Sequence, residues 1–136
     1  MRTLELLAPA KNLECGKMAI DHGADAVYIG ATRFGARAAA GNSVDDIRRL
    51  CEYAHPYGAR VYVTVNTIIY EDELSATRLL LKDLNACGVD ALLVQDMGIL
   101  EMVAEWREPE PFKMELHAST QTDNRSAEKV RWRQEL

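Results

Sequence analysis

The sequence lacks the features that mark several classes of protein. Its 136 residues include only three cysteines, and their odd number and wide spacing support neither a disulfide framework nor a metal site. No apolar run approaches the ~20 residues that a membrane span needs, and the first residues do not have the pattern of a secretory signal. We therefore expect one domain over residues 1–136, without a membrane partner and located in the cytoplasm.

The sequence also lacks the short motifs that are typical of common phosphate-binding, hydrolytic and zinc sites. It contains no Gly-x-x-x-x-Gly-Lys phosphate loop, no Gly-x-Ser-x-Gly elbow and no His-Glu-x-x-His zinc helix. A net charge of −5 argues against a general nucleic-acid-binding surface, because phosphate contacts need clustered lysine and arginine. His117 and Ser119 are close in sequence, but such a pair needs an orienting acid from elsewhere, so the residues alone give a protease little support.

What the sequence does contain is a repeated device, a helix stopped by glycine and followed at once by an apolar strand. It occurs at Gly23–Ile29, Gly58–Val65 and Gly88–Val94. Glycine can take the left-handed conformation that ends a helix, and the β-branched residues that follow suit a strand buried on both faces. The pattern predicts an α/β fold of parallel βα repeats.

The predicted elements make about five βα units. Strands are expected at Leu4–Ala8, Ala26–Ile29, Val61–Val65, Ala91–Val94 and Met114–His117. Helices are expected at residues 12–22 with Asn12 as the cap, from the cap Ser43 to Gly58, after the acidic residues 71–73, at residues 99–106, and from about Asp123 to the end. Each cysteine, at positions 15, 51 and 87, falls in a predicted helix, and we expect all three to be reduced, buried and unligated.

Five units allow two architectures. One is a flavodoxin-like doubly wound sheet, which has about this strand number. The other is the first part of a TIM-barrel-like (βα)₈ fold, whose full form needs ~250 residues. Periodicity alone does not separate the two. In both, ligands bind where the strands end, so the polar residues just past each strand are the candidate site residues.

The candidate catalytic residues are Asp96 and His117, which follow or end the fourth and fifth strands. For each there is a structural alternative, since Asp96 can cap the next helix and His117 can be a hydrogen-bonding structural residue. The candidate substrate-binding residues are Tyr28, Arg33, Arg37, Asn66, Gln95, Ser119 and Gln121. The two arginines lie in a long loop after the second strand, where their planar groups can grip a carboxylate or phosphate unless they only face solvent.

Six longer segments are more specific than any short motif. They are Glu5–Ala10, Gly23–Gly30, Phe34–Arg37, Val63–Thr67, Gly88–Asp96 and Leu116–Gln121. In this order they resemble the amino-terminal part of the U32 peptidase family, also called collagenase-like proteases, and the resemblance covers essentially the whole chain. The segments Phe34–Arg37, Gln95–Gly98 and His117–Gln121 look most like the branch linked to hydroxylation of a cytidine in large-subunit ribosomal RNA.

The resemblance implies a barrel that continues past Leu136, and thus a truncated barrel rather than a flavodoxin-like sheet. It favours RNA base hydroxylation, with an RNA substrate bound through the full-length protein. A collagenase-like protease and a non-catalytic binding module are the alternatives. Some relatives use an iron–sulfur cluster held by cysteines downstream of this region. We therefore expect no cofactor in this chain and no turnover by it alone. A truncated barrel also leaves its first and fifth strands as unpaired edges, so we expect the chain to associate with itself through them.

Overall fold

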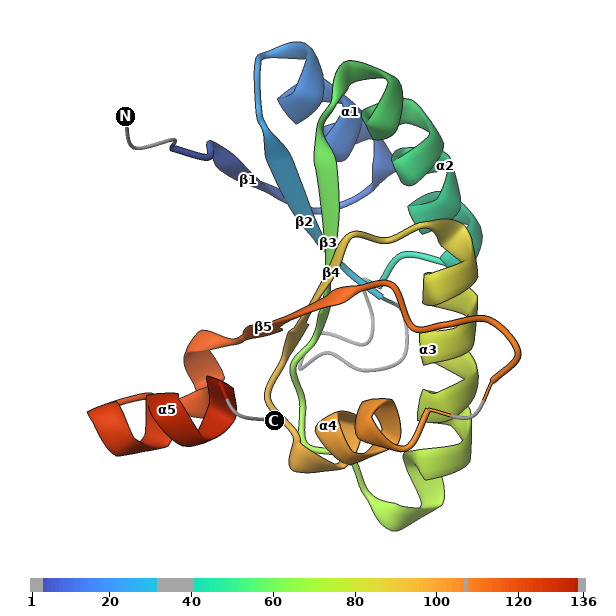
Figure 1. Ribbon diagram of the computed structural model, residues 1–136. Coiled ribbons are helices and arrows are strands. Elements are labelled where there is room, and N and C mark those ends of the chain that lie inside the picture. Colours follow the sequence, from blue (N-terminus) through green and yellow to red (C-terminus); the bar gives the residue numbers. More distant parts are fainter. Residues whose placement is uncertain (1–3, 32–40, 107, 135–136) are drawn as a thin grey trace.

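A computed structural model describes residues 4–31, 41–106 and 108–134 (Figure 1). Five strands form one sheet: β1 (Leu7–Ala10), β2 (Ala26–Gly30), β3 (Arg60–Val65), β4 (Ala91–Val94) and β5 (Glu115–Ala118). The α-helices are α1 (Leu13–Asp21), α2 (Val44–Ala54), α3 (Leu74–Cys87), α4 (Met97–Ala104) and α5 (Ala127–Gln134). Short 3-10 turns lie at η2 (His55–Tyr57), η3 (Glu71–Glu73) and η4 (Thr120–Thr122). No described helix is long and apolar enough to cross a membrane.

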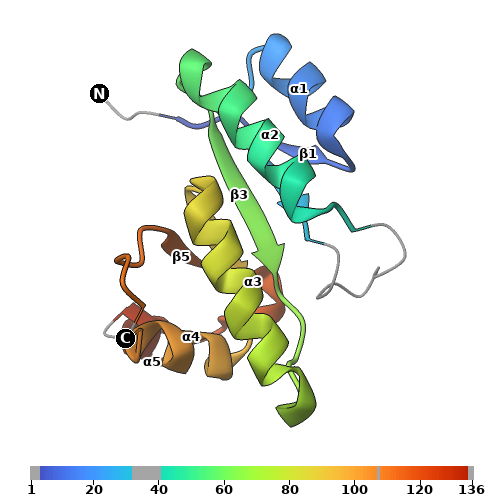
Figure 2. The same cartoon turned by 90° about the vertical axis from the view of Figure 1, so that its right-hand side faces the viewer.

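The strands pair in chain order, β1-β2-β3-β4-β5, and every pair is parallel. A flavodoxin-like sheet would have the order 2-1-3-4-5, with β1 inside the sheet. Sequential order with α1, α2 and α3 on one face is the arrangement of a TIM-type barrel (Figures 1 and 2). The TIM-barrel-like prediction is confirmed, and the flavodoxin-like alternative is wrong for the described strands. β1 and β5 are the edges of this open sheet, and self-association through them stays a prediction.

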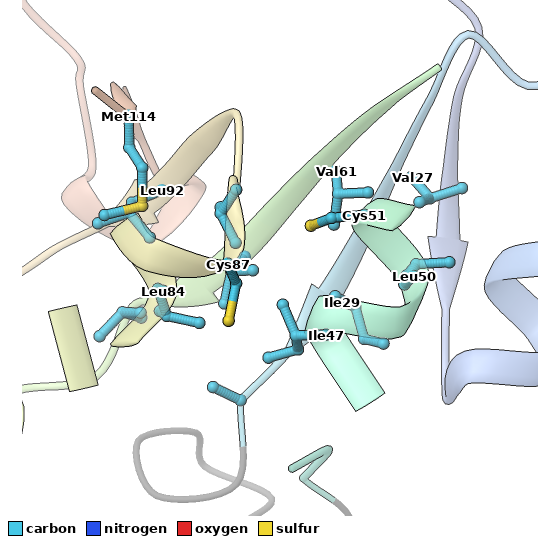
Figure 3. Packing of buried hydrophobic residues seen from close by; sticks show 14 of the residues in the cluster. Val27, Ile29, Ile47, Leu50, Cys51, Val61, Leu84, Cys87, Leu92 and Met114 are labelled. Carbon is cyan, nitrogen blue, oxygen red and sulfur yellow. The ribbon is translucent and has the colours of Figure 1, made fainter. Parts of the chain in front are cut away.

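Alternation along β3 divides the sheet into two faces. Val61, Val63 and Val65 are fully buried toward the helices, in a core that also takes in Ile29, Leu50, Leu84 and Leu92. Figure 3 shows Ile29 of β2 beside Ile47 and Leu50 of α2. Burying each such side chain contributes about 1.5–3 kcal/mol to the stability of the fold. We call the opposite side the inner face, and it carries Ala26, Tyr28, Tyr62, Ala91, Leu93 and His117.

Local signals in the sequence fix several element ends. The side chain of Asn12 caps α1 by accepting from the Cys15 amide at 2.9 Å. Ser43 and Asp46 form a capping box on α2, and the hydrogen bonds from Ser43 hold the pKa of the Asp46 carboxyl below its usual value. Gly88 ends α3 with φ +79°, a left-handed conformation that favours glycine. These predicted caps are confirmed.

The predicted boundaries differ most at β1 and α5, and by one or two residues at β2, β3, β5 and α4. The first strand is Leu7–Ala10 rather than Leu4–Ala8, so it includes Pro9. Proline is tolerated there because β1 is an edge strand, with a partner on one side only. The last predicted helix does not begin near Asp123, because that residue takes φ +51° and separates η4 from α5.

The three cysteines are free but differ in exposure. Cys51 and Cys87 are buried in α2 and α3, as predicted, whereas Cys15 is exposed, so that part of the prediction is wrong. α1 buries Leu13, Gly16 and Ile20 instead, because that stripe of the helix packs on the core and Cys15 lies off it. Burial raises the pKa of the Cys51 thiol to about 12, since an apolar environment disfavours the thiolate.

This difference predicts the thiol reactivity of the folded protein. One thiol, that of Cys15, should react rapidly with an aromatic disulfide reagent, and the other two only after denaturation. The measurement is the absorbance of the released aromatic thiol over time. The Cys15→Ser variant should lose the rapid phase and keep the other two thiols. Rapid reaction of all three thiols in the native protein would contradict this packing.

Candidate functional site

The carboxyl ends of β3, β4 and β5 lie at one edge of the sheet, where side-chain hydrogen bonds connect them. Asn66 follows β3, and its Nδ2 donates to Oγ of Ser119, beyond β5, at 3.1 Å. Ser119 is only 4% exposed, and its backbone N–H donates to the Val94 carbonyl of β4 at 2.8 Å. The backbone N–H of Gln121 donates to the same Ser119 Oγ at 3.3 Å. Three predicted site residues, Asn66, Ser119 and Gln121, are therefore brought together.

Asp96 is the N-cap of α4. Its Oδ1 accepts from the Gly98 amide at 2.7 Å, and its Oδ2 accepts from the Ile69 amide at 3.1 Å. The capping alternative is thus observed, and the same carboxylate also holds the segment that follows β3. Gln95, the residue before it, is half-buried at the end of β4. The catalytic role of Asp96 stays a prediction.

His117 lies inside β5 on the inner face, one residue before the end of the strand. Its Nε2 is 3.2 Å from Oε2 of Glu115, and its ring meets the Tyr62 ring with centroids 5.1 Å apart and planes at 76°. Tyr28 of β2 stands beside Tyr62 in the strand register, on the same face. His117 and Tyr28 thus belong to the wall of the inner face, whereas Asn66, Asp96 and Gln121 lie past the strand ends.

Arg33 and Arg37 lie outside the described residues, but the base of their loop is described. Asn42 is 7% exposed, and its Nδ2 donates to the carbonyls of Lys11 at 3.2 Å and Gly30 at 3.0 Å. The backbone N–H of Asn42 also donates to the Gly30 carbonyl, so Asn42 is tied to the ends of β1 and β2. Sequence reasoning missed Asn42. The sequence shows only that Asn42 precedes the cap Ser43, and its burial comes from the structure.

The side chains at this edge of the sheet can bind a polar ligand through hydrogen bonds. Asn66, Gln95 and Gln121 offer carboxamides, which both donate and accept hydrogen bonds. The Oγ of Ser119 bonds to Asn66 and Nε2 of His117 bonds to Glu115, so these two side chains do not form a nucleophile–base pair. Within the described ranges, no three histidine, cysteine or acidic side chains gather closely enough to hold a metal ion.

The bond between Asn66 and Ser119 predicts a thermodynamic coupling. Asn66→Ala and Ser119→Ala should each lower the free energy of unfolding, and the double variant should cost less than their sum by about 0.5–1.5 kcal/mol. Denaturant titration of the four proteins measures this. Asn66→Ala combined with Cys15→Ser, a substitution in α1 on an exposed surface, is the matched control and should be additive. A coupling of zero between Asn66 and Ser119 would contradict the connection across the strand ends.

Comparison with known proteins places the chain among relatives. Residues 11–136 match the model of the family described as Peptidase family U32. The chain is 52% identical over 129 residues to the 23S rRNA 5-hydroxycytidine C2501 synthase of Escherichia coli strain K12, an alignment that covers 95% of this chain and 19% of the relative. It is 40% identical over 118 residues to tRNA hydroxylation protein P1 of Bacillus subtilis strain 168, covering 86% of this chain and 27% of the relative.

A solved structure shares the fold. The U32 peptidase Mk0906 superposes with a TM-score of 0.68 at 14% sequence identity, covering 96% of this chain and 55% of that chain. At this identity the likeness concerns the fold alone. The chain spans only 19% and 27% of the length of the two curated relatives. With a family match over nearly all of its length, the chain belongs to peptidase family U32.

Proposed function

We propose that this chain is the amino-terminal region of an RNA-hydroxylating U32 protein whose substrate is a cytidine of 23S ribosomal RNA. The observation that carries the proposal is the 52% identity to the Escherichia coli 23S rRNA 5-hydroxycytidine synthase over 95% of this chain. A second RNA-directed relative, the Bacillus subtilis tRNA hydroxylation protein, aligns over 86% of it. The expected cytoplasmic location agrees with such a substrate.

The described residues support a role in holding the target base. Carboxamides such as Asn66, Gln95 and Gln121 can match the mixed donors and acceptors on the edge of a nucleobase. An unstacked base can also pack on an aromatic ring, which Tyr28 and His117 provide on the inner face. In the proposal His117 and Asp96 act on the substrate, and Asp96 also holds the edge in shape. Arg33 and Arg37 contact phosphate.

The overall charge limits what this region does by itself. A net charge of −5 gives no broad basic surface, so most phosphate contacts must come from other parts of a longer protein. We also expect the chain's cysteines not to be ligands of an iron–sulfur cluster. Cys51 and Cys87 are buried with raised pKa values, because burial disfavours their thiolates, and Cys15 is exposed on α1. A cluster, if the longer protein holds one, would need thiolates from elsewhere.

Proteolysis is the weaker alternative. The family description contains the word peptidase, but Ser119 and His117 have separate hydrogen-bond partners, and the likeness to the solved U32 peptidase concerns the fold alone. A non-catalytic binding module would use the same carboxamide edge without turnover. Measuring the RNA product and the cleavage of a protein substrate separates the three functions.

A domain exchange tests the proposal. In an Escherichia coli strain lacking its synthase, the aligned 129 residues of that enzyme are replaced by this chain, and 5-hydroxycytidine in 23S rRNA is measured by mass spectrometry of nucleosides. The exchange should restore the modification. His117→Ala should lower it by about 100-fold or more if the imidazole takes part in proton transfer.

The matched control is His22→Ala, which removes an exposed histidine at the end of α1 whose ring, within the part of the chain that the structure describes, bonds to its own helix. It should leave the modification unchanged. A folded, stably expressed chimera that yields no 5-hydroxycytidine, or one that degrades gelatin instead, would contradict the proposed function.

A further inference from the structure

Tyr62 is a buried titratable side chain to which none of the roles above is assigned. It lies in β3 on the inner face and is 3% exposed, although α1, α2 and α3 cover the other side of the sheet. In register it stands between Tyr28 of β2 and Ala91 of β4. Its neighbours in the strand, Val61 and Val63, are apolar and pack on the opposite face against the helices, whereas Tyr62 brings a large ring with a hydroxyl group to the inner face.

The ring of Tyr62 reaches across β4 to β5. Neighbouring strands are ~4.8 Å apart, so β3 and β5 are separated by about twice that distance. Ala91 occupies the intervening position on β4 and leaves room for the ring to pass. Beyond it the Tyr62 ring meets His117 at 5.1 Å between centroids, in the edge-to-face geometry that aromatic pairs prefer.

The hydroxyl end of Tyr62 is also held. It donates to Oε2 of Glu5 at 2.7 Å, and the Arg60 guanidinium lies 3.9 Å from the same oxygen. Burial, followed by the hydrogen bond to Glu5, raises the pKa of Tyr62, so its hydroxyl stays protonated and remains a donor at neutral pH. The ring is therefore fixed by an anchored hydroxyl at one end and by His117 at the other.

His117 is in turn engaged at one nitrogen. Its Nε2 bonds to Glu115 at 3.2 Å, and no described residue bonds to its Nδ1. The ionisable groups of this cluster come from the segment before β1 (Glu5), from β3 (Arg60 and Tyr62) and from β5 itself (Glu115). β4 contributes the half-buried apolar side chain of Leu93 beside His117.

We propose that Tyr62, anchored through its hydroxyl to Glu5, is a positioning residue that holds the His117 ring so that Nε2 faces Glu115 and Nδ1 is the nitrogen left for the substrate. The inference rests on the proposed function for what His117 does to RNA, but the positioning itself is a property of this chain. It assigns a role to Tyr62, Glu5 and Ala91, for which sequence reasoning suggested none.

The test is the state of the His117 ring, observed by long-range ¹⁵N–¹H NMR of the protein labelled at histidine between about pH 5 and pH 9. The wild-type neutral ring should show one tautomer, with the proton on Nε2, and a nuclear Overhauser contact to the Tyr62 ring. Tyr62→Met fills similar space without an aromatic face and should give averaged tautomers. Tyr62→Phe keeps the ring but loses the hydroxyl bond to Glu5, so it should give a change smaller than that of Tyr62→Met and larger than zero.

Val63→Ala is the matched control, because it removes buried volume from the same strand on the opposite face. It should leave the His117 signals unchanged although it destabilises the fold, and the signals of His22 and His55 should not move in any variant. A wild-type ring with averaged tautomers or no contact to Tyr62 would overturn the inference. Equal changes in Tyr62→Met and Val63→Ala, or in Tyr62→Met and Tyr62→Phe, would also overturn it.

A second arm uses the chimeric synthase. Tyr62→Met should lower 5-hydroxycytidine by about 10-fold or more, since misplacing a reacting group is costly, and Val63→Ala should not. Full modification by Tyr62→Met would overturn the positioning role. A wild-type chimera without any 5-hydroxycytidine would overturn the proposed function instead, and the NMR result would then decide the positioning of His117 independently.

Discussion

The backbone hydrogen bonds that join β3 to β2 on one side and to β4 on the other are the interaction on which the rest of this structure depends. Because both pairings are parallel and the strands follow chain order, every carboxyl end reaches the same edge. The same register sends Val61, Val63 and Val65 into the helical core and Tyr62 to the inner face. A slip of one residue would exchange these two sets of side chains.

The candidate site is built from bonds between the strand ends rather than from a set of isolated reactive groups. Asn42 joins the ends of β1 and β2, and Asp96 joins the segment after β3 to the start of α4. Asn66 and Ser119 connect β3 to β5 across β4. A polar group buried without a partner costs about 1–3 kcal/mol, so these mutual bonds are what allow polar side chains to gather at this edge. A ligand that binds there meets groups that are already fixed in place.

The elements that depend on local chemistry were predictable from the sequence. Asn12 and Ser43 were recognised as caps, and β4 has the predicted bounds, because caps, glycine stops and apolar runs act over a few residues. The placement of the polar residues after β3, β4 and β5 was predictable for the same reason, once a parallel sheet was assumed.

What depends on pairing between distant segments was not predictable. Strand order cannot be read from the periodicity of the sequence. The choice between a flavodoxin-like and a TIM-barrel-like sheet therefore came from the family resemblance, and the observed strand order now decides it. The exposure of Cys15 follows from which stripe of α1 meets the core. The contact of Tyr62 with His117 needs the small Ala91 between them, a relation among three strands that no local pattern carries. The roles of Arg33 and Arg37 stay predictions.

The central claim is the sequential strand order, and amide hydrogen exchange of the native protein measures it most directly. β2 has partners on both sides, whereas β1 is an edge. We therefore expect the amides of β2 and β3 to exchange slowest and those of β1 to exchange much faster than those of β2. In a flavodoxin-like sheet β1 is internal and β2 is the edge, so slower exchange in β1 than in β2 would contradict the account.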